Sequence, residues 1–440
     1  MNAEQKALEI FKAAVNAVQP MQVMPQFIQW IDEQLYIDGE KIHLNSTTKI
    51  YIIGAGKASA AMALVIEEIL GDNIEAGIVT TKYHHQLPLK KINCIQAAHP
   101  VPDEQSVLAV QQTIELLNKV QPNDIVLCLL SGGASALWTD LPDGISLNEL
   151  QNLFQLLLNC GANIDEMNCV RKHLSYIKGG QLLRYAPKAK WFSFIISDVP
   201  FDDITVIASG PTVLDTTTFS EALNVLKKYH LIEQCPSSIV QYVEKGVNGL
   251  ITETIQLSQK IELNICKNIV VANNQMAVNA AKEKANSFGY TIVALNESMI
   301  GDASAMAKKI IHLANQYTGN IPAAIVIGGE TTVVVKCNGK GGRNQHLALS
   351  ALIELFELGN HTKHTITLLS AGTDGTDGPT DAAGAIIGKA TYKLMNDVEL
   401  LPNEYLSNND SYNFFNQING LLRTGATQTN VMDILIVLIE

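Results

Sequence analysis

The sequence predicts an α/β protein of two domains, and three observations support this prediction. Its 440 residues exceed the usual size of a single hydrophobic core. Short β-rich runs alternate with amphipathic helical segments, which is typical of a mostly parallel sheet. Several runs are apolar throughout, as expected for strands covered on both faces. The expected strands are 49–53, 92–97, 125–130, 191–196, 269–272, 292–295, 323–327 and 365–369.

Composition excludes several classes of partner. Hydrophobic residues make up 47% and charged residues 17% of the chain, and no run reaches the roughly 18 apolar residues of a membrane span. The net charge of −12 argues against nucleic acid or an anionic membrane, because both require a basic surface. Seven cysteines without a C-x-x-C pair predict reduced thiols and a cytoplasmic location.

Local signals place one helix and one domain boundary. Ser146 and Glu149 form a capping-box pattern ahead of the apolar run 150–158, which predicts a helix there. The polar segment 236–267 contains no motif with recognisable chemistry, so we expect it to join the domains. The expected domains are therefore residues 1–245 and 246–440.

The first glycine-rich loop follows the expected strand 49–53. In Gly54-Ala55-Gly56-Lys57 two glycines lead into a helix, so backbone N–H groups and the Lys57 charge would form an anion site. The loop lacks the Walker A spacing, and Ser59 stands where a dinucleotide fingerprint has its third glycine. The alternative is a tight turn with a solvated lysine.

A second loop, Ser131-Gly132-Gly133-Ala134-Ser135, follows the strand 125–130. It offers N–H groups and two hydroxyls at the carboxyl end of a strand, where ligands bind in open α/β sheets. The alternative is that its glycines only turn the chain.

Cationic side chains cluster after these loops in an otherwise acidic sequence. Arg171, Lys172, His173 and Lys178 could surround an anionic substrate, although such a run is usually a solvated helix face. His99 has no second His or Cys at metal-ligand spacing, so a structural role is expected.

Acidic side chains also follow expected strands. Asp198 comes directly after the strand 191–196, where it could hold Mg²⁺ or accept a hydroxyl proton, with helix capping as the alternative. In the C-terminal half, Glu330 follows another strand and Arg343 begins a helix after a glycine run. Asp374 and Asp377 lie in one glycine-rich loop. Together, these loops fit phosphoryl transfer, which relies on positioning, Mg²⁺ and cationic charge.

The motifs in this order resemble those of the class II glycerate kinases, the family with a C-terminal MOFRL domain. The match runs from about Ile50 to Asp433. The motifs are G-A-G-K-A, H-P-V-P-D-E, L-L-S-G-G-x-S-A-L, V-R-K-H-L-S-x-I-K-G-G, I-S-D-V, A-S-G-P-T, G-G-E-T-T-V, G-G-R-N-Q and G-T-D-G-T-D-G-P-T-D-A-A-G-A.

The resemblance implies two α/β domains, the N-terminal one Rossmann-like with a mostly parallel sheet, and an active site in the interdomain cleft. It implies ATP and Mg²⁺ as cofactors and phosphate transfer to the 2-hydroxyl of D-glycerate, giving 2-phosphoglycerate. By similarity, Lys57 and Arg343 are the expected catalytic cations. Residue type and position make Asp198 a candidate catalytic base, and Asp198 and Glu330 candidate metal ligands. On the same grounds, the candidate substrate- or phosphate-binding residues are Gly54, Gly56, Ser131, Gly132, Gly133, Ser135, Arg171 and Lys172. The candidate nucleotide-binding residues are Gly329, Glu330, Thr331, Asp374 and Asp377.

The sequence departs from the family pattern at three positions. Ala134 replaces a third glycine, which adds one methyl group and reduces backbone freedom. Ala426 and Gln428 replace a Pro and a Gly, which puts substrate range or turnover in doubt more than fold. Two alternative functions are also retained. One is an NAD(P)H-dependent hydroxypyruvate reductase, which would need a complete dinucleotide fingerprint. The other is a non-catalytic sugar-acid binding protein. The expected partners are D-glycerate and ATP, without nucleic acid or membrane, and a homodimer is left open.

Overall fold

The computed structural model describes residues 1–256, 266–295, 297–397 and 400–440. The chain divides into two compact units. We name Val23–Val271 the central unit, and Met1–Gln22 together with Ala272–Glu440 the terminal unit. Within the described residues, no helix combines the length and apolar character needed to cross a membrane.

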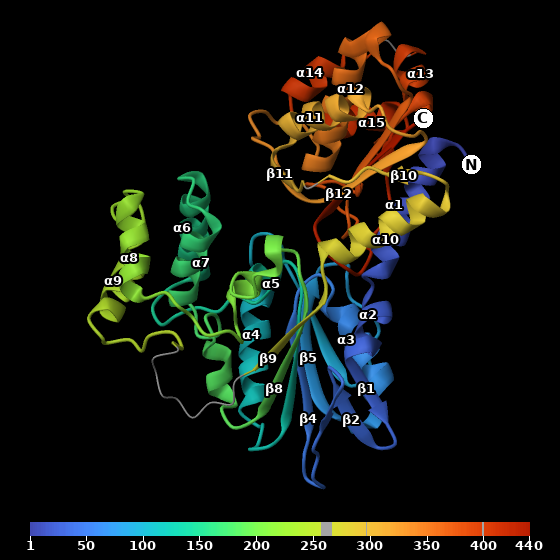
Figure 1. The fold of residues 1–440 in the computed structure, drawn as a ribbon. Coiled ribbons are helices and arrows are strands. Elements are labelled where there is room, and N and C mark those ends of the chain that lie inside the picture. The colour runs from blue at the N-terminus through green and yellow to red at the C-terminus, as the bar shows by residue number, and fades with distance from the viewer. Residues whose placement is uncertain (257–265, 296, 398–399) are drawn as a thin grey trace. The chain divides into compact units, whose positions relative to one another are not determined.

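The central unit is built on a six-stranded sheet with the order β6-β5-β4-β7-β8-β9. The pairs β4–β5, β4–β7, β5–β6 and β7–β8 are all parallel, which confirms the mostly parallel sheet predicted for the N-terminal part. Helices α3 (Ser59–Leu70) and α4 (Glu104–Leu117) cover opposite faces of this sheet (Figure 1). The strands are β4 (Ile50–Ala55), β5 (Ile74–Lys82), β6 (Ile92–Ala97), β7 (Ile125–Leu130), β8 (Lys190–Ile196) and β9 (Lys267–Ala272).

A helical layer of the central unit has its own apolar core. The capping box of Ser146 and Glu149 is present and begins α6, as predicted. Buried side chains from four helices, among them Leu153, Val170, Leu226 and Ile239, form this core. The four helices are α6 (Leu147–Asn159), α7 (Ile164–His173), α8 (Phe219–Lys228) and α9 (Ser237–Val247).

Short elements complete the central unit. Strands β1 (Ile28–Ile31), β2 (Gln34–Ile37) and β3 (Glu40–Ile42) form a separate antiparallel sheet. Helix α2 (Pro20–Phe27) begins in the terminal unit and ends in the central unit. The other short helices are α5 (Ala134–Leu137), η1 (Gly71–Asn73), η2 (Gln181–Tyr185), η3 (Pro200–Asp202) and η4 (Ile207–Ser209).

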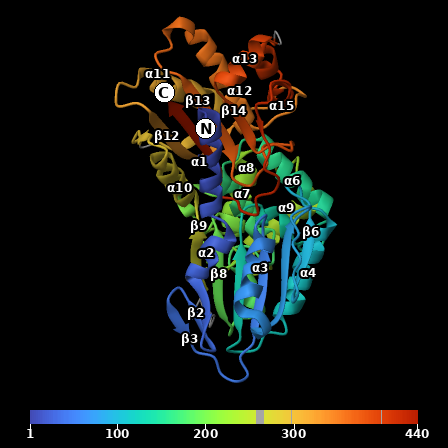
Figure 2. The same cartoon turned by 90° about the vertical axis from the view of Figure 1, so that its right-hand side faces the viewer.

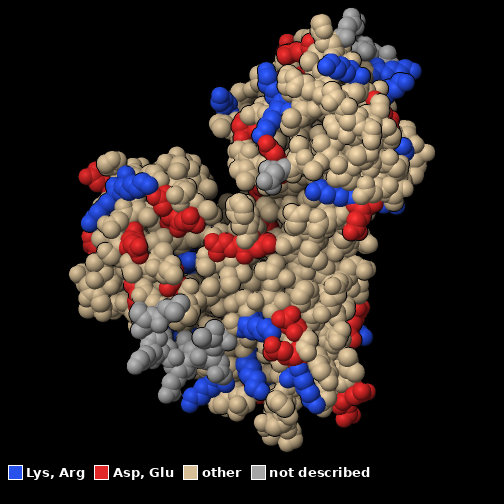
Figure 3. Space-filling view, viewed as in Figure 1, with Lys and Arg blue, Asp and Glu red and all other residues tan. Residues whose placement is uncertain are grey.

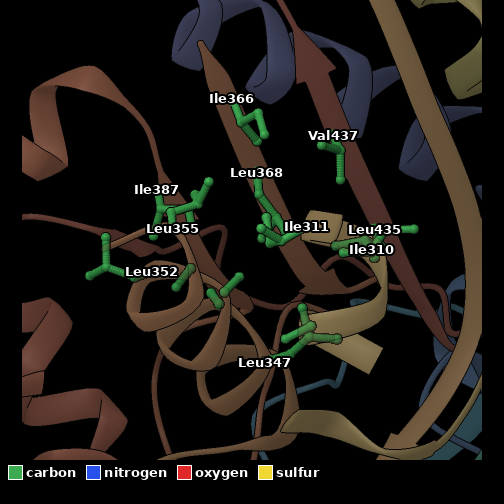
Figure 4. Close-up of a cluster of buried hydrophobic side chains, with 14 of the residues drawn as sticks. Ile310, Ile311, Leu347, Leu352, Leu355, Ile366, Leu368, Ile387, Leu435 and Val437 are labelled. Atoms are coloured by element: carbon green, nitrogen blue, oxygen red, sulfur yellow. The ribbon is translucent and has the colours of Figure 1, made fainter. Parts of the chain in front are cut away.

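The terminal unit contains a mixed sheet with the order β10-β12-β16-β13-β14-β15, and β11 also pairs with β12. The last strand, β16, lies between β12 and β13 and is antiparallel to both. The hydrophobic core of the terminal unit includes Leu347, Leu352, Leu368 and Val437 (Figure 4). The strands are β10 (Thr291–Ile292), β11 (Met299–Asp302), β12 (Ala323–Thr332), β13 (Ile366–Gly372), β14 (Gly384–Ile387), β15 (Leu421–Leu422) and β16 (Asp433–Ile439).

The N-terminal helix α1 (Ala3–Ala17) belongs to the terminal unit. Its buried face includes Ala7, Ile10 and Phe11, and it packs on α10 (Asn274–Ser287), β13 and β16. Figures 1 and 2 both show α1 beside α10. The other helices of this unit are α11 (Ala303–Gln316), α12 (Arg343–Leu358), η5 (Gly359–His361), α13 (Lys389–Asp397), α14 (Pro402–Ser407) and α15 (Ser411–Gln417).

The observed division of the chain differs from the expected boundary between residues 245 and 246. That position lies inside α9, whose Ile239, Tyr242 and Val243 are buried in the central unit. The polar composition of segment 236–267 concealed this amphipathic helix, and β9 then adds a strand to the central sheet. Residues 257–265 of the expected join lie outside the described residues.

Charged side chains are mixed on the surface. On the face in Figure 3, Lys and Arg alternate with Asp and Glu over each unit, and the described residues form no continuous basic surface there. This distribution agrees with the acidic net charge of the sequence.

Candidate active site

The central sheet has a topological switch point between β4 and β7. From β4 the chain continues to β5 and β6 on one side, whereas β7 and β8 lie on the other side. Ligands of open α/β sheets bind outside the carboxyl ends of the strands at such a point. The two predicted loops of this unit, residues 54–58 and 131–135, lie at the carboxyl ends of these two strands, although Gly54 and Ala55 still belong to β4.

The backbone amides of the loop after β4 bind the protein itself. Gly56 N donates to Thr80 O at 3.0 Å, and Lys57 N donates to Gly132 O at 2.9 Å. Ala58 N donates to the Ser131 hydroxyl at 3.0 Å. The expected cradle of amides is therefore absent from this stretch, and the half-buried Lys57 side chain is the cationic group that the loop presents.

Close packing between the two loops explains the glycines. Gly56 has φ 134°, and a Cβ at this position would lie 2.1 Å from the Ser131 hydroxyl oxygen. A Cβ on Gly54 would lie 2.4 Å from Leu129 O. Ser131 is fully buried and joins the two loops. Gly54, Gly56 and Ser131 thus shape the site, and direct contact with substrate stays a prediction for them.

The loop after β7 is the donor-rich part of the switch point. Within the described part of the chain, the N–H groups of Gly132 and Gly133 donate no hydrogen bond. Gly133 has φ 85°, and a Cβ there would lie 2.9 Å from His99 Cδ2 and 3.6 Å from Lys57 Cε. Two amides, an imidazole and an ammonium group therefore lie together, which is an arrangement suited to an anion.

A chain of three polar side chains begins at the end of the same loop. The Ser135 and Ser209 hydroxyls are 3.0 Å apart, and Ser209 donates to Asn168 Oδ1 at 3.0 Å. Ser209 and Asn168 are buried, and Asn168 Nδ2 has no partner among the described residues. Ser209 lies in the A-S-G-P-T motif and Asn168 lies two residues before the V-R-K-H motif, and the sequence alone indicated no role for either.

The predicted cations of α7 are engaged by the protein. Arg171 lies over the Phe154 ring, 4.9 Å from its centroid, and burial lowers the pKa of this arginine. Lys172 Nζ lies 3.2 Å from Asp215 Oδ1, and both side chains are buried. Lys172 is therefore one half of a buried ion pair, and its binding of substrate stays a prediction.

His173 and Lys178 are also buried among protein acceptors. His173 contacts Cys169 O at 2.7 Å and lies 3.0 Å from Glu253 Oε1. Burial on its own would lower the pKa of His173, but these two partners raise it to about 10. Lys178 Nζ donates to Trp138 O at 2.6 Å, and burial lowers the pKa of this lysine to about 8.

Asp198 follows β8, the neighbour of β7 in the sheet. It is half-buried, and its backbone position places it at the same edge as the two switch-point loops. Carboxyl ends of adjacent parallel strands meet at one edge, so Lys57, Ser131 and Asp198 follow three successive strands of that edge.

Arg343 is the centre of the candidate site in the terminal unit. It is the first residue of α12 and donates to Asp433 through Nε at 2.6 Å and through Nη2 at 2.9 Å. Nη1 donates to Glu330 Oε1 at 2.5 Å. Burial on its own would lower the pKa of Arg343, but Asp433 and Glu330 raise it. Asp433 is fully buried, and sequence reasoning missed it.

Asp377 caps α12. Its two carboxylate oxygens accept from Asn344 N at 3.1 Å and from Gln345 N at 2.8 Å. Burial raises the pKa of Asp377 to about 6. Because this carboxylate occupies the first amides of the helix, the α12 N-terminus already holds an anion from the chain itself.

The other nucleotide-binding candidates serve local structure. Asp374 is buried and accepts from Thr376 N at 2.9 Å, which fixes the turn. Strand β12 extends through the predicted loop, and a Cβ on Gly329 would lie 2.5 Å from Met299 O. The buried Thr331 hydroxyl has no partner among the described residues. Their contact with nucleotide stays a prediction.

The carboxylates of the candidate site are ligands that suit Mg²⁺, although the described residues contain no large group of metal-binding side chains. Among the described residues, no three His, Cys, Asp or Glu side chains come together as a metal site. Mg²⁺ in phosphotransferases is usually held by one or two carboxylates together with substrate phosphates. Asp198 in the central unit and Glu330 in the terminal unit each offer one such carboxylate.

The fold and these loops define an α/β protein with an anion-binding switch point. Residues 6–244 match the family described as "Domain of unknown function (DUF4147)", and residues 323–433 match the MOFRL family. A protein called glycerate 2-kinase from Pyrococcus horikoshii is 36% identical over 100% of this chain and 98% of its own length. A D-glycerate 2-kinase from Thermotoga maritima is 38% identical over 98% of this chain and 97% of its own length.

A solved structure agrees with these relatives. The crystal structure of a glycerate kinase from Thermotoga maritima has a TM-score of 0.82 and 36% identity, and 99% of each chain is covered. Similarity of this extent covers both units, including every candidate residue above. The chain therefore belongs to the class II glycerate kinases, a family of transferases.

Proposed function

We propose that this chain transfers the γ-phosphate of ATP to the 2-hydroxyl of D-glycerate and releases 2-phosphoglycerate. The main support is the geometry after β4 and β7, where Lys57 lies beside the two Gly132 and Gly133 amides. A carboxylate or a phosphoryl group needs such convergent donors. The names of the full-length relatives supply the substrate class.

Each candidate residue then has a distinct task. Lys57 supplies a positive charge, and the two glycine amides supply directional hydrogen bonds to the anion. Asp198 is the candidate base for the reacting hydroxyl, because it follows the strand adjacent to β7. Arg343 is the candidate cation for the charge that spreads over the phosphoryl oxygens in the transition state.

Asp433 restricts the orientation of the Arg343 guanidinium group for this task. Three of the five guanidinium N–H groups donate to Asp433 and Glu330, so two are left for another acceptor. A planar group held on one edge by a buried carboxylate has few orientations open to it. When bound, Mg²⁺ would neutralise phosphate charge, and Asp198 and Glu330 are the carboxylates proposed to hold it. A cytoplasmic location is also proposed, and the seven free cysteines support it.

Two coupled assays test the proposal. The purified chain is incubated with ATP, Mg²⁺ and D-glycerate, ADP is measured, and enolase detects 2-phosphoglycerate but not the 3-isomer. We expect ADP and direct enolase turnover, both reduced at least about 100-fold in Lys57→Ala. ADP without enolase turnover would move the phosphate to the 3-hydroxyl.

Matched variants separate catalysis from folding. Arg343→Lys keeps a charge against Asp433 but loses the planar fork, so we expect a large loss of kcat in a folded protein. Lys49→Ala and Arg423→Ala remove exposed cations paired with Glu75 and Asp381, and they serve as controls. Oxidation of NAD(P)H with hydroxypyruvate, in the absence of ADP release, would favour the reductase instead.

A further inference from the structure

The chain Ser135–Ser209–Asn168 runs from an accessible residue into the core. Ser135, on α5, is half-buried, whereas Ser209 is fully buried on η4 and Asn168 is 3% exposed on α7. Three separate elements thus bring one residue each to a continuous line of hydrogen bonds. Only the Ser135 end of this line reaches the edge of the sheet where the switch-point loops lie.

The direction of each hydrogen bond follows from counting hydrogens. A serine hydroxyl has one hydrogen, and Ser209 gives its hydrogen to Asn168 Oδ1, which can only accept. The 3.0 Å contact between the two serines therefore requires Ser135 to donate to Ser209. The Ser135 oxygen is left with lone pairs alone toward a ligand, so it accepts hydrogen bonds and disfavours an anion.

The same chain binds a hydroxyl without ionising it. Its inner end is a neutral carboxamide, and neither Asn168 nor Ser209 can take up a proton near neutral pH. A hydroxyl whose proton must leave during the reaction needs a base, and this chain contains none. The chain therefore suits a hydroxyl that stays protonated throughout the reaction.

The backbone around Ser209 holds this geometry. Ala208 has φ 54° and Ser209 has φ 58°, a conformation that residues with a side chain rarely adopt. Gly179 N donates to Ser209 O at 3.1 Å, and Gly180 N donates to Gly210 O at 2.8 Å. Such strained backbone persists where neighbouring contacts enforce it, and it is concentrated at functional sites.

A second chain of the same kind in the central unit is buried at its serine end, because Ser193 and Thr212 are buried and only Asn268 is half-buried. The Ser193 hydroxyl lies 3.0 Å from that of Thr212, and Thr212 donates to Asn268 Oδ1 at 2.8 Å. Ser193 is fully buried in β8 and also contacts Cys266 Sγ at 3.2 Å. The serine of this second chain is therefore closed to a ligand, which makes Ser193 a matched control for Ser135.

We propose that Ser135 accepts a hydrogen bond from the hydroxyl of the sugar acid that is not phosphorylated, and that Ser209 and Asn168 are positioning residues that set this polarity. The proposal rests on the proposed function for the identity of the substrate. It predicts that the site selects 2-hydroxy acids with a further hydroxyl on carbon 3. Lys57 and the glycine amides bind the anionic group, so Ser135 adds selectivity to the charge recognition.

Binding of two acids without nucleotide tests the proposal. D-glycerate and D-lactate differ only in the carbon-3 hydroxyl, and titration calorimetry gives a Kd for each. We expect the wild type to bind D-glycerate about tenfold more tightly, a typical contribution for one hydrogen bond in a desolvated site. Ser135→Ala and Ser209→Ala should reduce this difference to less than about twofold, chiefly by weakening D-glycerate.

Two further variants test the polarity and the structural explanation. Asn168→Asp keeps an acceptor for Ser209, so it should weaken both acids through its charge but keep their ratio. Ser193→Ala should lower the melting temperature and also keep the ratio. An unchanged ratio in Ser135→Ala or in Ser209→Ala, or a ratio lost in Asn168→Asp, would overturn the proposal.

The outcome also separates this inference from the proposed function. A wild type that binds D-glycerate tenfold more tightly than D-lactate but releases no ADP would retain the inference and refute the kinase reaction. A wild type that phosphorylates D-glycerate but binds both acids equally would refute the inference alone. If neither acid binds, both proposals fail.

Discussion

The central and terminal units use cationic residues in different ways at the ends of their strands. In the central unit, Lys57 lies beside two backbone amides that donate to no other group among the described residues. In the terminal unit, Arg343 donates to two carboxylates, and Asp377 occupies the first amides of its helix. Glycine-rich motifs of similar appearance thus leave two backbone amides without an acceptor among the described residues of one unit, whereas carboxylates of the chain itself occupy the arginine and the helix amides in the other.

The comparison shows that the role of a cationic side chain in such a motif depends on the groups with which it pairs. The central unit also contains a neutralised cation, because Lys172 pairs with the buried Asp215. In Lys172–Asp215 and in Arg343–Asp433, a lysine or arginine thus pairs with a fully buried carboxylate, and of these two cations we assign catalysis only to Arg343. Four variants, ordered by expected effect, test this assignment.

The largest effect is expected for Asp433→Asn. Loss of this fully buried charge leaves Arg343 without its bidentate partner, which should cost about 3 kcal/mol of unfolding free energy and lower kcat about 100-fold or more. Urea unfolding and the ADP assay measure the two quantities. Asp381→Asn is the control, because its pair with Arg423 is exposed and should contribute less than about 1 kcal/mol.

A similar loss of stability, with a smaller loss of activity, is expected for Lys172→Met. It leaves Asp215 charged and buried, so the unfolding free energy should fall by about 3 kcal/mol. The added change Asp215→Asn removes that charge and should restore at least half of the loss. If the double variant is stable but has lost affinity for D-glycerate, Lys172 contacts the substrate, as its charge in an acidic sequence led us to expect.

The third effect concerns the pH dependence of Asp377. Burial raises its folded-state pKa to about 6 from an ordinary 3.8, so the folded protein binds more protons than the unfolded chain between these values. Stability from this group is complete below about pH 4 and falls by roughly 3 kcal/mol as the pH rises through 6.

Asp377→Asn isolates this contribution. The difference in unfolding free energy between pH 4 and pH 7, measured in wild type and variant, should show the fall in the wild type only. An equal fall in both proteins would mean that the two backbone amides offset the burial of this carboxylate.

The smallest effect on stability is expected for Glu330→Gln. The side chains of Arg343 and Glu330 are 33% and 41% exposed, so loss of their pair should change the unfolding free energy by less than about 1 kcal/mol. If Glu330 holds Mg²⁺, the concentration of Mg²⁺ for half-maximal rate should rise several-fold. An unchanged Mg²⁺ requirement with a lower KM for ATP would make Glu330 only a counterion of Arg343.

The sequence alone predicted much of the central unit. Apolar runs marked β4, β7 and most of β8, because strands buried on both faces need uninterrupted apolar residues. The edge strand β6 was also predicted, although it contains Asn93 and Gln96. The sequence did not predict β5, whose run contains Glu75 and two threonines, or the central position of β16 in the terminal sheet. Strand order depends on pairing between distant segments, which local patterns do not encode.

The candidate site, like the fold, was predicted only in part from the sequence. The sequence determined which residue types stand at the ends of strands, and hence Lys57, Asp198 and Arg343 as candidates. Only the tertiary structure decided which cationic side chains pair with a carboxylate of the chain itself, because the partners are far apart in the sequence. Asp433 follows Arg343 by 90 residues, and Asp215 follows Lys172 by 43. The energy of a charge or a hydroxyl depends on its neighbours in space and on its burial, and both arise only when the chain has folded.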